Sequence, residues 1–212
     1  MADPRRHVPG PLGLLEALLD APAGPPRAAV VFAHPLPTEG GTMHTKVVFQ
    51  AAKALTRIGC VVLRFNFRGV GLSAGAWDNG RGELDDYKAA MAFMAAEYPD
   101  LEMWAAGFSF GSYIAATVGA DEARVCALIA IAPPVHKYEF ASVKMSPKPK
   151  FIIHGEHDEL ISLKLVRHFY AQLQEPKDLI EIDRANHLFD GQASEVGDAL
   201  ADLLEDFSCR TQ

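Results

Sequence analysis

The segment Gly107-Phe108-Ser109-Phe110-Gly111 lies between two different periodicities. Leu101 to Ala106, before it, has the apolar pattern of a buried strand, and Ser112 to Val118, after it, has the pattern of a helix. A G-x-S-x-G motif at such a junction holds its serine in a sharp, strained turn that exposes the hydroxyl group. The flanking glycines let the strand and the helix approach each other closely. Ser109 is therefore the candidate nucleophile.

A serine hydroxyl needs a histidine as base and a carboxylate to orient that histidine, and both follow Ser109 in this chain. Asp158 comes shortly after the apolar run Phe151–Ile153, and His187 comes shortly after Leu179–Ile182. Each member thus follows a predicted strand, in the chain order serine, aspartate, histidine. We predict that Ser109, Asp158 and His187 form a catalytic triad.

With these motifs the chain resembles the small α/β-hydrolases of the carboxylesterase and dienelactone-hydrolase type, from about Ala28 to about Phe207. The resemblance extends to three further segments, Ala33–Pro37, Gly40–Met43 and Arg64–Ser73. It implies an α/β-hydrolase fold, in which a mostly parallel central sheet of about seven strands carries helices on both faces.

The resemblance also implies an oxyanion hole. In similar hydrolases one donor is a backbone N–H of the loop after the first parallel strand, which maps here to Leu36, and the other is the N–H of the residue after the nucleophile, Phe110. Close relatives often have His-Pro-His-Pro where this chain has His34-Pro35-Leu36-Pro37. A backbone donor survives that difference, whereas a side-chain role does not.

Short runs rich in β-branched residues alternate with helical patterns along the chain, which is typical of a parallel sheet covered on both faces. The predicted strands are Ala29–Ala33, Cys60–Asn66, Glu102–Phe108, Val125–Ala132, Lys150–His154 and Leu179–Asp183. The predicted helices are Lys46–Ile58, Glu83–Glu97, Phe110–Gly119, Leu163–Gln174 and Ala193–Phe207. Leu12–Leu19 is ambiguous by periodicity, and the resemblance implies an antiparallel strand at the edge of the sheet.

Length and composition suit one compact domain over residues 1–212, with 49% apolar residues. The net charge of −7, without a cluster of Lys and Arg, predicts no nucleic-acid partner and no anionic membrane partner. No apolar stretch follows Met1–His7, so the expected location is the cytoplasm. The odd, scattered set Cys60, Cys126 and Cys209 predicts reduced thiols rather than a disulfide framework.

The segment between Ala132 and Lys150 is where larger members of the fold insert a helical lid. It has seventeen residues here, four of them proline, and predicts an ordered loop beside an open cleft. An open cleft favours small or exposed esters. Tyr138, Phe140 and Met145 either line that cleft or pack the loop onto the sheet.

Other polar residues compete for roles in the site. His136 is a weaker base candidate than His187, and Asp183 and Asp190 are weaker acid candidates than Asp158, because they do not directly follow a strand at the expected place. The remaining histidines lack a zinc-binding pattern, so we expect no metal. We expect His34 to shape the oxyanion loop, His157 to be solvated or hydrogen-bonded locally, and Arg68 to bind neighbouring carbonyl groups in a structural turn.

The motifs together predict a serine hydrolase that cleaves a small-molecule ester by two-step acyl transfer and needs no cofactor. The same groups cleave thioesters and some amides, so a thioesterase or an amidase stays open. The fold also occurs in non-catalytic binding proteins, which commonly lose a triad member. The sequence leaves open whether the chain forms a homodimer.

Overall fold

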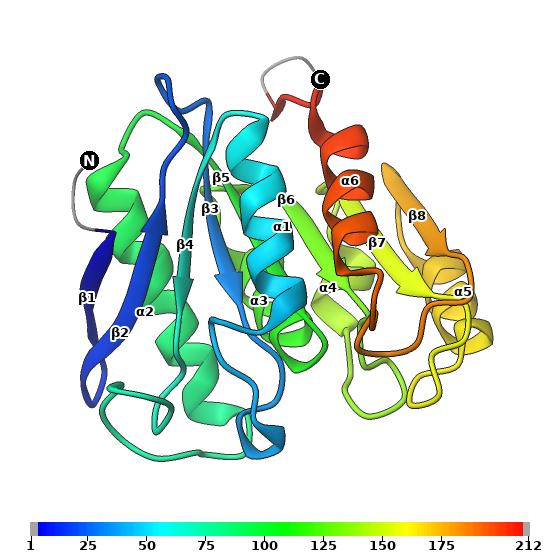
Figure 1. The fold of residues 1–212 in the computed structure, drawn as a ribbon, viewed down its shortest axis with the longest axis horizontal. Coiled ribbons are helices and arrows are strands. Elements are labelled where there is room, and N and C mark those ends of the chain that lie inside the picture. The colour runs from blue at the N-terminus through cyan, green and yellow to red at the C-terminus, as the bar shows by residue number, and fades with distance from the viewer. Residues whose placement is uncertain (1–3, 210–212) are drawn as a thin grey trace.

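A computed structural model describes residues 4–209, so Met1–Asp3 of the N-terminal segment considered above lie outside it. An eight-stranded sheet runs through the protein in the order β1-β2-β4-β3-β5-β6-β7-β8 (Figure 1). The strands are β1 (Arg5–Gly10), β2 (Gly13–Asp20), β3 (Ala28–Ala33), β4 (Cys60–Phe65), β5 (Glu102–Phe108), β6 (Val125–Ile131), β7 (Lys150–Gly155) and β8 (Lys177–Ile182). The strands β3 to β8 are parallel to one another, whereas β1 and β2 are antiparallel to their neighbours.

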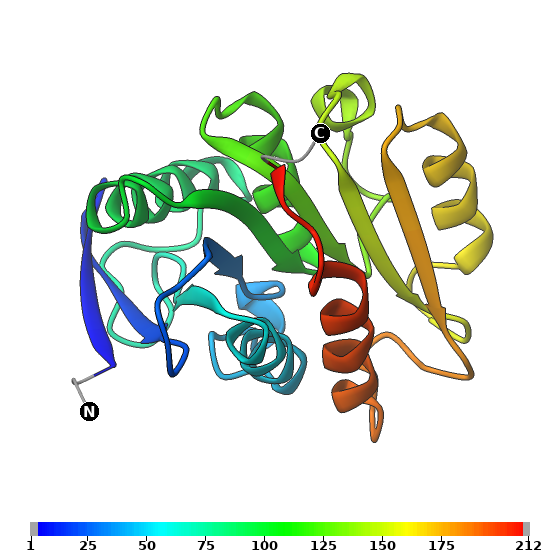
Figure 2. The same cartoon turned by 90° about the horizontal axis from the view of Figure 1, so that it is seen from above.

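Helices cover both faces of this sheet. They are α1 (Lys46–Arg57), α2 (Arg81–Glu97), α3 (Phe110–Asp121), α4 (Ala141–Met145), α5 (Leu163–Gln172) and α6 (Ala193–Leu204), with a 3-10 turn η1 (Pro37–Glu39). Figure 2 shows α1 and α6 on one face and α2, α3 and α5 on the other. Side chains of β3 and β4 are buried throughout, because alternate residues enter a separate hydrophobic cluster on each face.

The parallel strands and the five long helices lie where the sequence predicts them, and the N-terminal strands differ. The segment Leu12–Leu19 does form an antiparallel strand, β2, from Gly13 onward, but β2 lies between β1 and β4 and is not the edge of the sheet. The edge is β1, in which Val8 is the buried residue. Edge strands tolerate charged residues and proline, and β1 contains both. It therefore has no alternating apolar pattern from which a strand could be predicted.

The expectation of three reduced thiols is wrong for two of them, because Cys126 and Cys209 form a disulfide. After α6 the chain turns back over the sheet. The ring centroid of Phe207 lies 5.5 Å from that of Trp104 and 5.0 Å from that of Phe151. This packing brings the two cysteine Cα atoms within 6.0 Å of each other. The cysteines are 83 residues apart in the sequence, so no local spacing indicates that they pair. Cys60 is free, and burial raises the pKa of its thiol to about 11.

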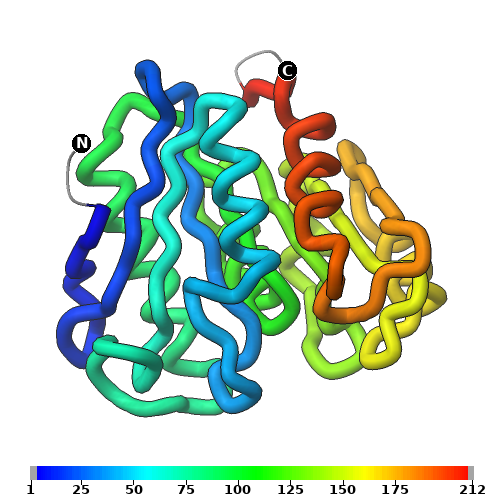
Figure 3. Tube along the Cα trace, viewed as in Figure 1, coloured from blue at the N-terminus to red at the C-terminus, as the bar shows by residue number. Residues whose placement is uncertain are grey.

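The loops that follow the six parallel strands gather at one edge of the sheet, the lower edge in Figure 3. Parallel strands place their carboxyl ends together, and this edge is where open α/β sheets bind ligands. Between β6 and β7 the chain forms the five-residue helix α4. In the described residues no helix is long and apolar enough to cross a membrane.

Candidate active site

Ser109 lies in a strained turn between β5 and α3. Its φ of 50° and ψ of −121° fall in a region that a non-glycine residue rarely adopts. A Cβ atom on Gly107 would lie 2.2 Å from the carbonyl oxygen of Gly111, and a Cβ on Gly111 would lie 2.4 Å from the carbonyl oxygens of Ala33 and His34. The two glycines thus allow β5, α3 and the end of β3 to meet at the serine.

The structure brings Ser109, His187 and Asp158 into one hydrogen-bonded chain. The Nε2 atom of His187 lies 3.0 Å from Ser109 Oγ, and its Nδ1 atom lies 2.7 Å from Asp158 Oδ2. An ionised carboxylate only accepts, so Nδ1 carries the proton and Nε2 is free to accept the serine proton. The side chain of Asp158 is fully buried, and that of His187 is 7% exposed.

Asp158 is held by its own loop as well as by His187. Its Oδ1 atom accepts the N–H groups of Leu160 at 2.9 Å and Ile161 at 2.7 Å. Burial alone would raise the pKa of Asp158, but the hydrogen bonds from His187 and Ile161 outweigh burial and lower it. The acid is therefore ionised at neutral pH, and each of its two oxygens has a fixed donor.

His187 is fixed from two sides. Its backbone N–H donates to Glu159 Oε2 at 3.2 Å, which ties the loop after β8 to the loop after β7. Its ring packs against Phe108, with centroids 5.6 Å apart and the planes inclined by 30°. The base can therefore rotate little away from Ser109. Sequence reasoning did not predict the Glu159 contact, because a carboxylate that accepts from a backbone N–H follows no spacing rule.

The predicted oxyanion loop is anchored by His34, as expected. The Nδ1–H of this fully buried ring donates to the Pro35 carbonyl at 2.7 Å, and its Nε2 accepts the N–H of Phe67 at 3.1 Å. Burial lowers the pKa of His34 to about 4, so the ring is neutral at working pH. The Leu36 carbonyl accepts from Glu39 and Gly41, both at 3.1 Å, which sets the orientation of the turn.

Phe110, the residue predicted to supply the second oxyanion donor, lies at the start of α3. It is the first residue of α3, a position at which an α-helix leaves the backbone N–H without an intrahelical partner. Its side chain is buried among Phe67, Trp77 and Tyr138, with ring centroids 5.2 to 5.9 Å away. The packed ring fixes the peptide next to Ser109.

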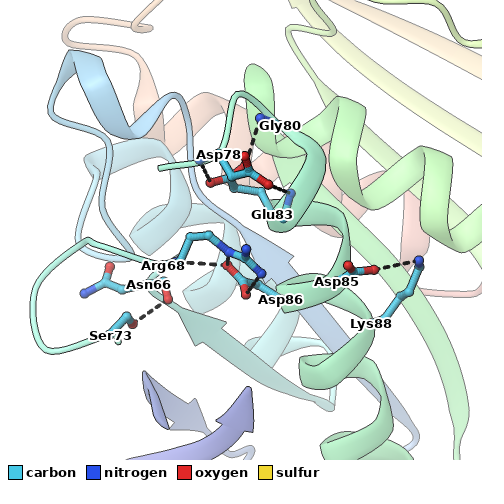
Figure 4. A network of polar contacts seen from close by, with 10 residues as sticks. Asn66, Arg68, Ser73, Asp78, Gly80, Glu83, Asp85, Asp86 and Lys88 are labelled. Atoms are coloured by element: carbon cyan, nitrogen blue, oxygen red, sulfur yellow. Dashed lines mark hydrogen bonds and ion pairs between the residues drawn. The ribbon is translucent and has the colours of Figure 1, made fainter. Parts of the chain in front are cut away.

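The loop after β4 is held by a buried ion pair, shown in Figure 4. Arg68 donates from Nε and Nη2 to the two carboxylate oxygens of Asp86 at 2.9 and 2.7 Å, and its backbone N–H donates to the same carboxylate. The structural role expected for Arg68 is thus correct, but its partner is a carboxylate on α2 rather than a set of carbonyl groups. Asp86 lies 18 residues away, and nothing in its local pattern marked it.

The competing candidates lie elsewhere. His136 and His157 are exposed, Asp183 pairs with Arg184 at 3.3 Å, and Asp190 accepts from Asn186 at 3.0 Å. Of the three residues considered for the pocket wall, Met145 is exposed and Phe140 is buried in the core. Tyr138 stacks on Tyr113 at 4.4 Å and lines, with Phe140, a cavity of about 200 Å³. Within residues 4–209 one group could hold a metal ion, Glu102 with Cys126 and Cys209, but those two sulfurs are bonded to each other.

Known proteins resemble this chain in sequence and in fold. Residues 24–145 match the family described as serine aminopeptidase, S33. A solved α/β serine hydrolase homologue from Coxiella burnetii is 38% identical, covers 96% of this chain and 98% of its own, and superposes with a TM-score of 0.91. The chain belongs to the α/β serine hydrolases. A lidless α/β serine hydrolase from Xanthomonas campestris is 35% identical, with 93% and 91% of the chains covered and a TM-score of 0.87.

An uncharacterized protein of Rickettsia prowazekii is 35% identical over 210 residues, which is 95% of this chain and 88% of that protein. These likenesses place this protein among the small lidless α/β-hydrolases, as the sequence motifs indicated. They agree with the short α4 segment between β6 and β7, which takes the place of a lid.

The oxyanion assignment is testable by contrasting two substitutions at Leu36. Leu36→Ala keeps the backbone N–H and should change kcat by less than about threefold, whereas Leu36→Pro removes the donor and should lower kcat about 10²- to 10³-fold. Steady-state kinetics on an activated ester measures both variants, and a thermal melt verifies that the proline variant is folded. Equal kcat values for two folded variants would show that Leu36 is not the donor.

Proposed function

We propose that this protein is a serine hydrolase that cleaves small carboxylic esters through an acyl-enzyme intermediate on Ser109, His187 and Asp158. The observation that carries the proposal is the continuous hydrogen-bonded chain from Ser109 Oγ through His187 to Asp158, 3.0 and 2.7 Å long in its two links. A serine, a histidine in the required tautomer and an ionised acid in this order are the parts of nucleophilic acyl transfer.

The proposed reaction has two steps. Nε2 of His187 takes the hydroxyl proton while Ser109 Oγ attacks the ester carbonyl carbon, and the N–H groups of Leu36 and Phe110 stabilise the oxyanion. His187 then returns the proton to the departing alcohol, which leaves an acyl group on Ser109. Water, deprotonated by His187, attacks the acyl-enzyme in the second step, and the carboxylic acid leaves as Ser109 regains its proton.

The surroundings of the triad suit an uncharged substrate. Leu160, two residues after Asp158, and Leu188, directly after His187, are exposed. Tyr138 and Trp77 lie half-buried against Phe110. Apolar and aromatic side chains with a few convergent polar groups are typical of small-molecule sites. An ester with small apolar substituents fits these groups better than a charged peptide does.

Labelling with a fluorophosphonate probe tests the proposal directly. Such probes react with a serine that is activated by a neighbouring base, so we expect stoichiometric labelling of wild-type protein at Ser109, located by peptide mass spectrometry. EDTA should change neither labelling nor ester hydrolysis, because the nucleophile and the base are protein side chains. Protein that binds no probe and hydrolyses no activated ester would be a non-catalytic member of the family.

The short α4 segment predicts the preferred chain length. Because a five-residue helix provides little surface to cover a long acyl chain, p-nitrophenyl esters with about two to six acyl carbons should have a higher kcat/KM than longer ones. A series from acetate to palmitate, measured below the solubility limit of each ester, gives the answer. An optimum at twelve carbons or beyond would mean that the 133–149 loop, or a second chain, builds a covered tunnel.

A further inference from the structure

His154 is a buried polar residue that the proposed triad leaves unexplained. It lies near the end of β7, and its side chain is fully buried. Its Nε2 atom lies 2.8 Å from the carbonyl oxygen of Ile161, whereas its Nδ1 atom is buried without a hydrogen-bond partner among residues 4–209. A buried nitrogen without a hydrogen-bond partner destabilises the folded state, and an apolar side chain at this position would avoid that penalty. The contact made by Nε2 is therefore the physical reason for a histidine at this position.

That contact closes the loop that carries the triad acid. The Ile161 N–H donates to Asp158 Oδ1 at 2.7 Å, and the Ile161 carbonyl accepts from His154. The Ile161 backbone is thus held at its N–H by Asp158 and at its carbonyl by His154 of β7. His154 Nε2 also lies 3.6 Å from Asp158 Oδ2, the oxygen that holds His187. The ring therefore lies directly beside the carboxylate.

The charge state of His154 follows from these neighbours. A carbonyl only accepts, so Nε2 carries a proton, and the ring is neutral as long as Nδ1 has none. The charged and titratable groups around it are Asp158, His187, and Glu181 of β8, which is paired with Arg167 of α5. Burial lowers the pKa of His154, and the Ile161 carbonyl and Asp158 offset that effect in part. A neutral His154 leaves the charge of Asp158 available to His187.

We propose that His154 is a positioning residue, whose neutral ring fixes the Asp158–Ile161 loop so that the carboxylate stays directed at His187. The proposal rests on the triad of the proposed function. It assigns His154 no contact with substrate. His154 affects the reaction only through the position of Asp158. Experiments can therefore distinguish its role from that of a residue that only fills the core.

The first test compares two substitutions. His154→Phe keeps the ring and removes the donor, and His154→Gln places an amide N–H near the position of Nε2. With kcat counted per fluorophosphonate-labelled site, we expect His154→Phe to lose about 10- to 100-fold with little change in KM, because the acid is no longer held in place. The apparent pKa of its kcat/KM profile should also fall, since a displaced carboxylate stabilises the imidazolium less. His154→Gln should recover most of the loss.

A double-mutant cycle with Asp158→Asn tests whether His154 acts through Asp158. If His154 acts through the acid, His154→Phe should lower kcat much less in the Asp158→Asn background than in the wild type. Equal losses in both backgrounds, or a His154→Phe enzyme with wild-type kcat per labelled site and a wild-type pH profile, would overturn the proposal. Wild-type protein that neither labels nor turns over would instead refute the proposed function.

A measurement on the wild type covers the case in which His154→Phe does not fold. In ¹⁵N NMR at neutral pH the His154 ring should show the neutral tautomer with the proton on Nε2. A ring that is doubly protonated at neutral pH, or that carries its proton on Nδ1, cannot fix the Ile161 carbonyl in the manner proposed and would contradict it.

Discussion

Replacing Ser109 or His187 by alanine is expected to lower kcat on a simple activated ester by several orders of magnitude, up to about 10⁶-fold, because the members of a triad act as a unit. In the proposed mechanism Ser109 supplies the bond-forming oxygen, and His187, whose Nε2 lies 3.0 Å away, is the base that accepts its proton. Either alanine variant keeps the residual rate enhancement that substrate binding and the proposed oxyanion donors provide. KM should change little, since neither side chain is expected to bind the ground state strongly.

The matched control for the histidine is His136→Ala, because His136 is exposed and, among residues 4–209, no hydrogen bond or ion pair joins it to the triad. It should retain wild-type kcat. Each variant is expressed without contaminating esterase, and its far-UV circular dichroism and thermal melt are compared with the wild type. A folded Ser109→Ala or His187→Ala enzyme with kcat within tenfold of the wild type would remove that residue from the mechanism.

The parts of the site that sequence predicts well are those fixed by local chemistry. Gly107 and Gly111 are needed because the backbones meet there, and Ser109 must lie between them. Asp158 and His187 each follow a buried strand, so topology carries both to one edge of the sheet. Chain order and element boundaries were sufficient to name the three residues that the structure joins by hydrogen bonds.

The parts that sequence did not predict depend on tertiary contacts between distant or irregular segments. The Cys126–Cys209 disulfide depends on where the chain turns after α6, and the Arg68–Asp86 pair depends on how α2 lies against the loop after β4. In the sequence His154 is one of two histidines shortly before Asp158, and its Nε2 contact with Ile161 becomes apparent only from the fold. No periodicity encodes such contacts, since each is set by packing around it.

Asp158→Asn should lower kcat by about 10⁴-fold at neutral pH, through the tautomer of His187 rather than through lost structure. The N–H groups of Leu160 and Ile161 face Oδ1, so the asparagine must keep its carbonyl oxygen there and turn its NH₂ group toward His187. Facing a donor, Nδ1 of His187 must accept, and the ring proton moves to Nε2. A protonated Nε2 cannot take the proton of Ser109.

The pH dependence separates this explanation from a general loss of charge. In the wild type kcat/KM should fall towards acidic pH, since a protonated imidazole cannot act as base. The pKa of Asp158 lies below its ordinary value, so the loss of activity at mildly acidic pH should follow one protonation and not two. Asp183→Asn and Asp190→Asn remove exposed carboxylates close to His187 in the chain, and both should retain wild-type rates. If either lowers kcat as much as Asp158→Asn does, the acid of the triad has been assigned to the wrong residue.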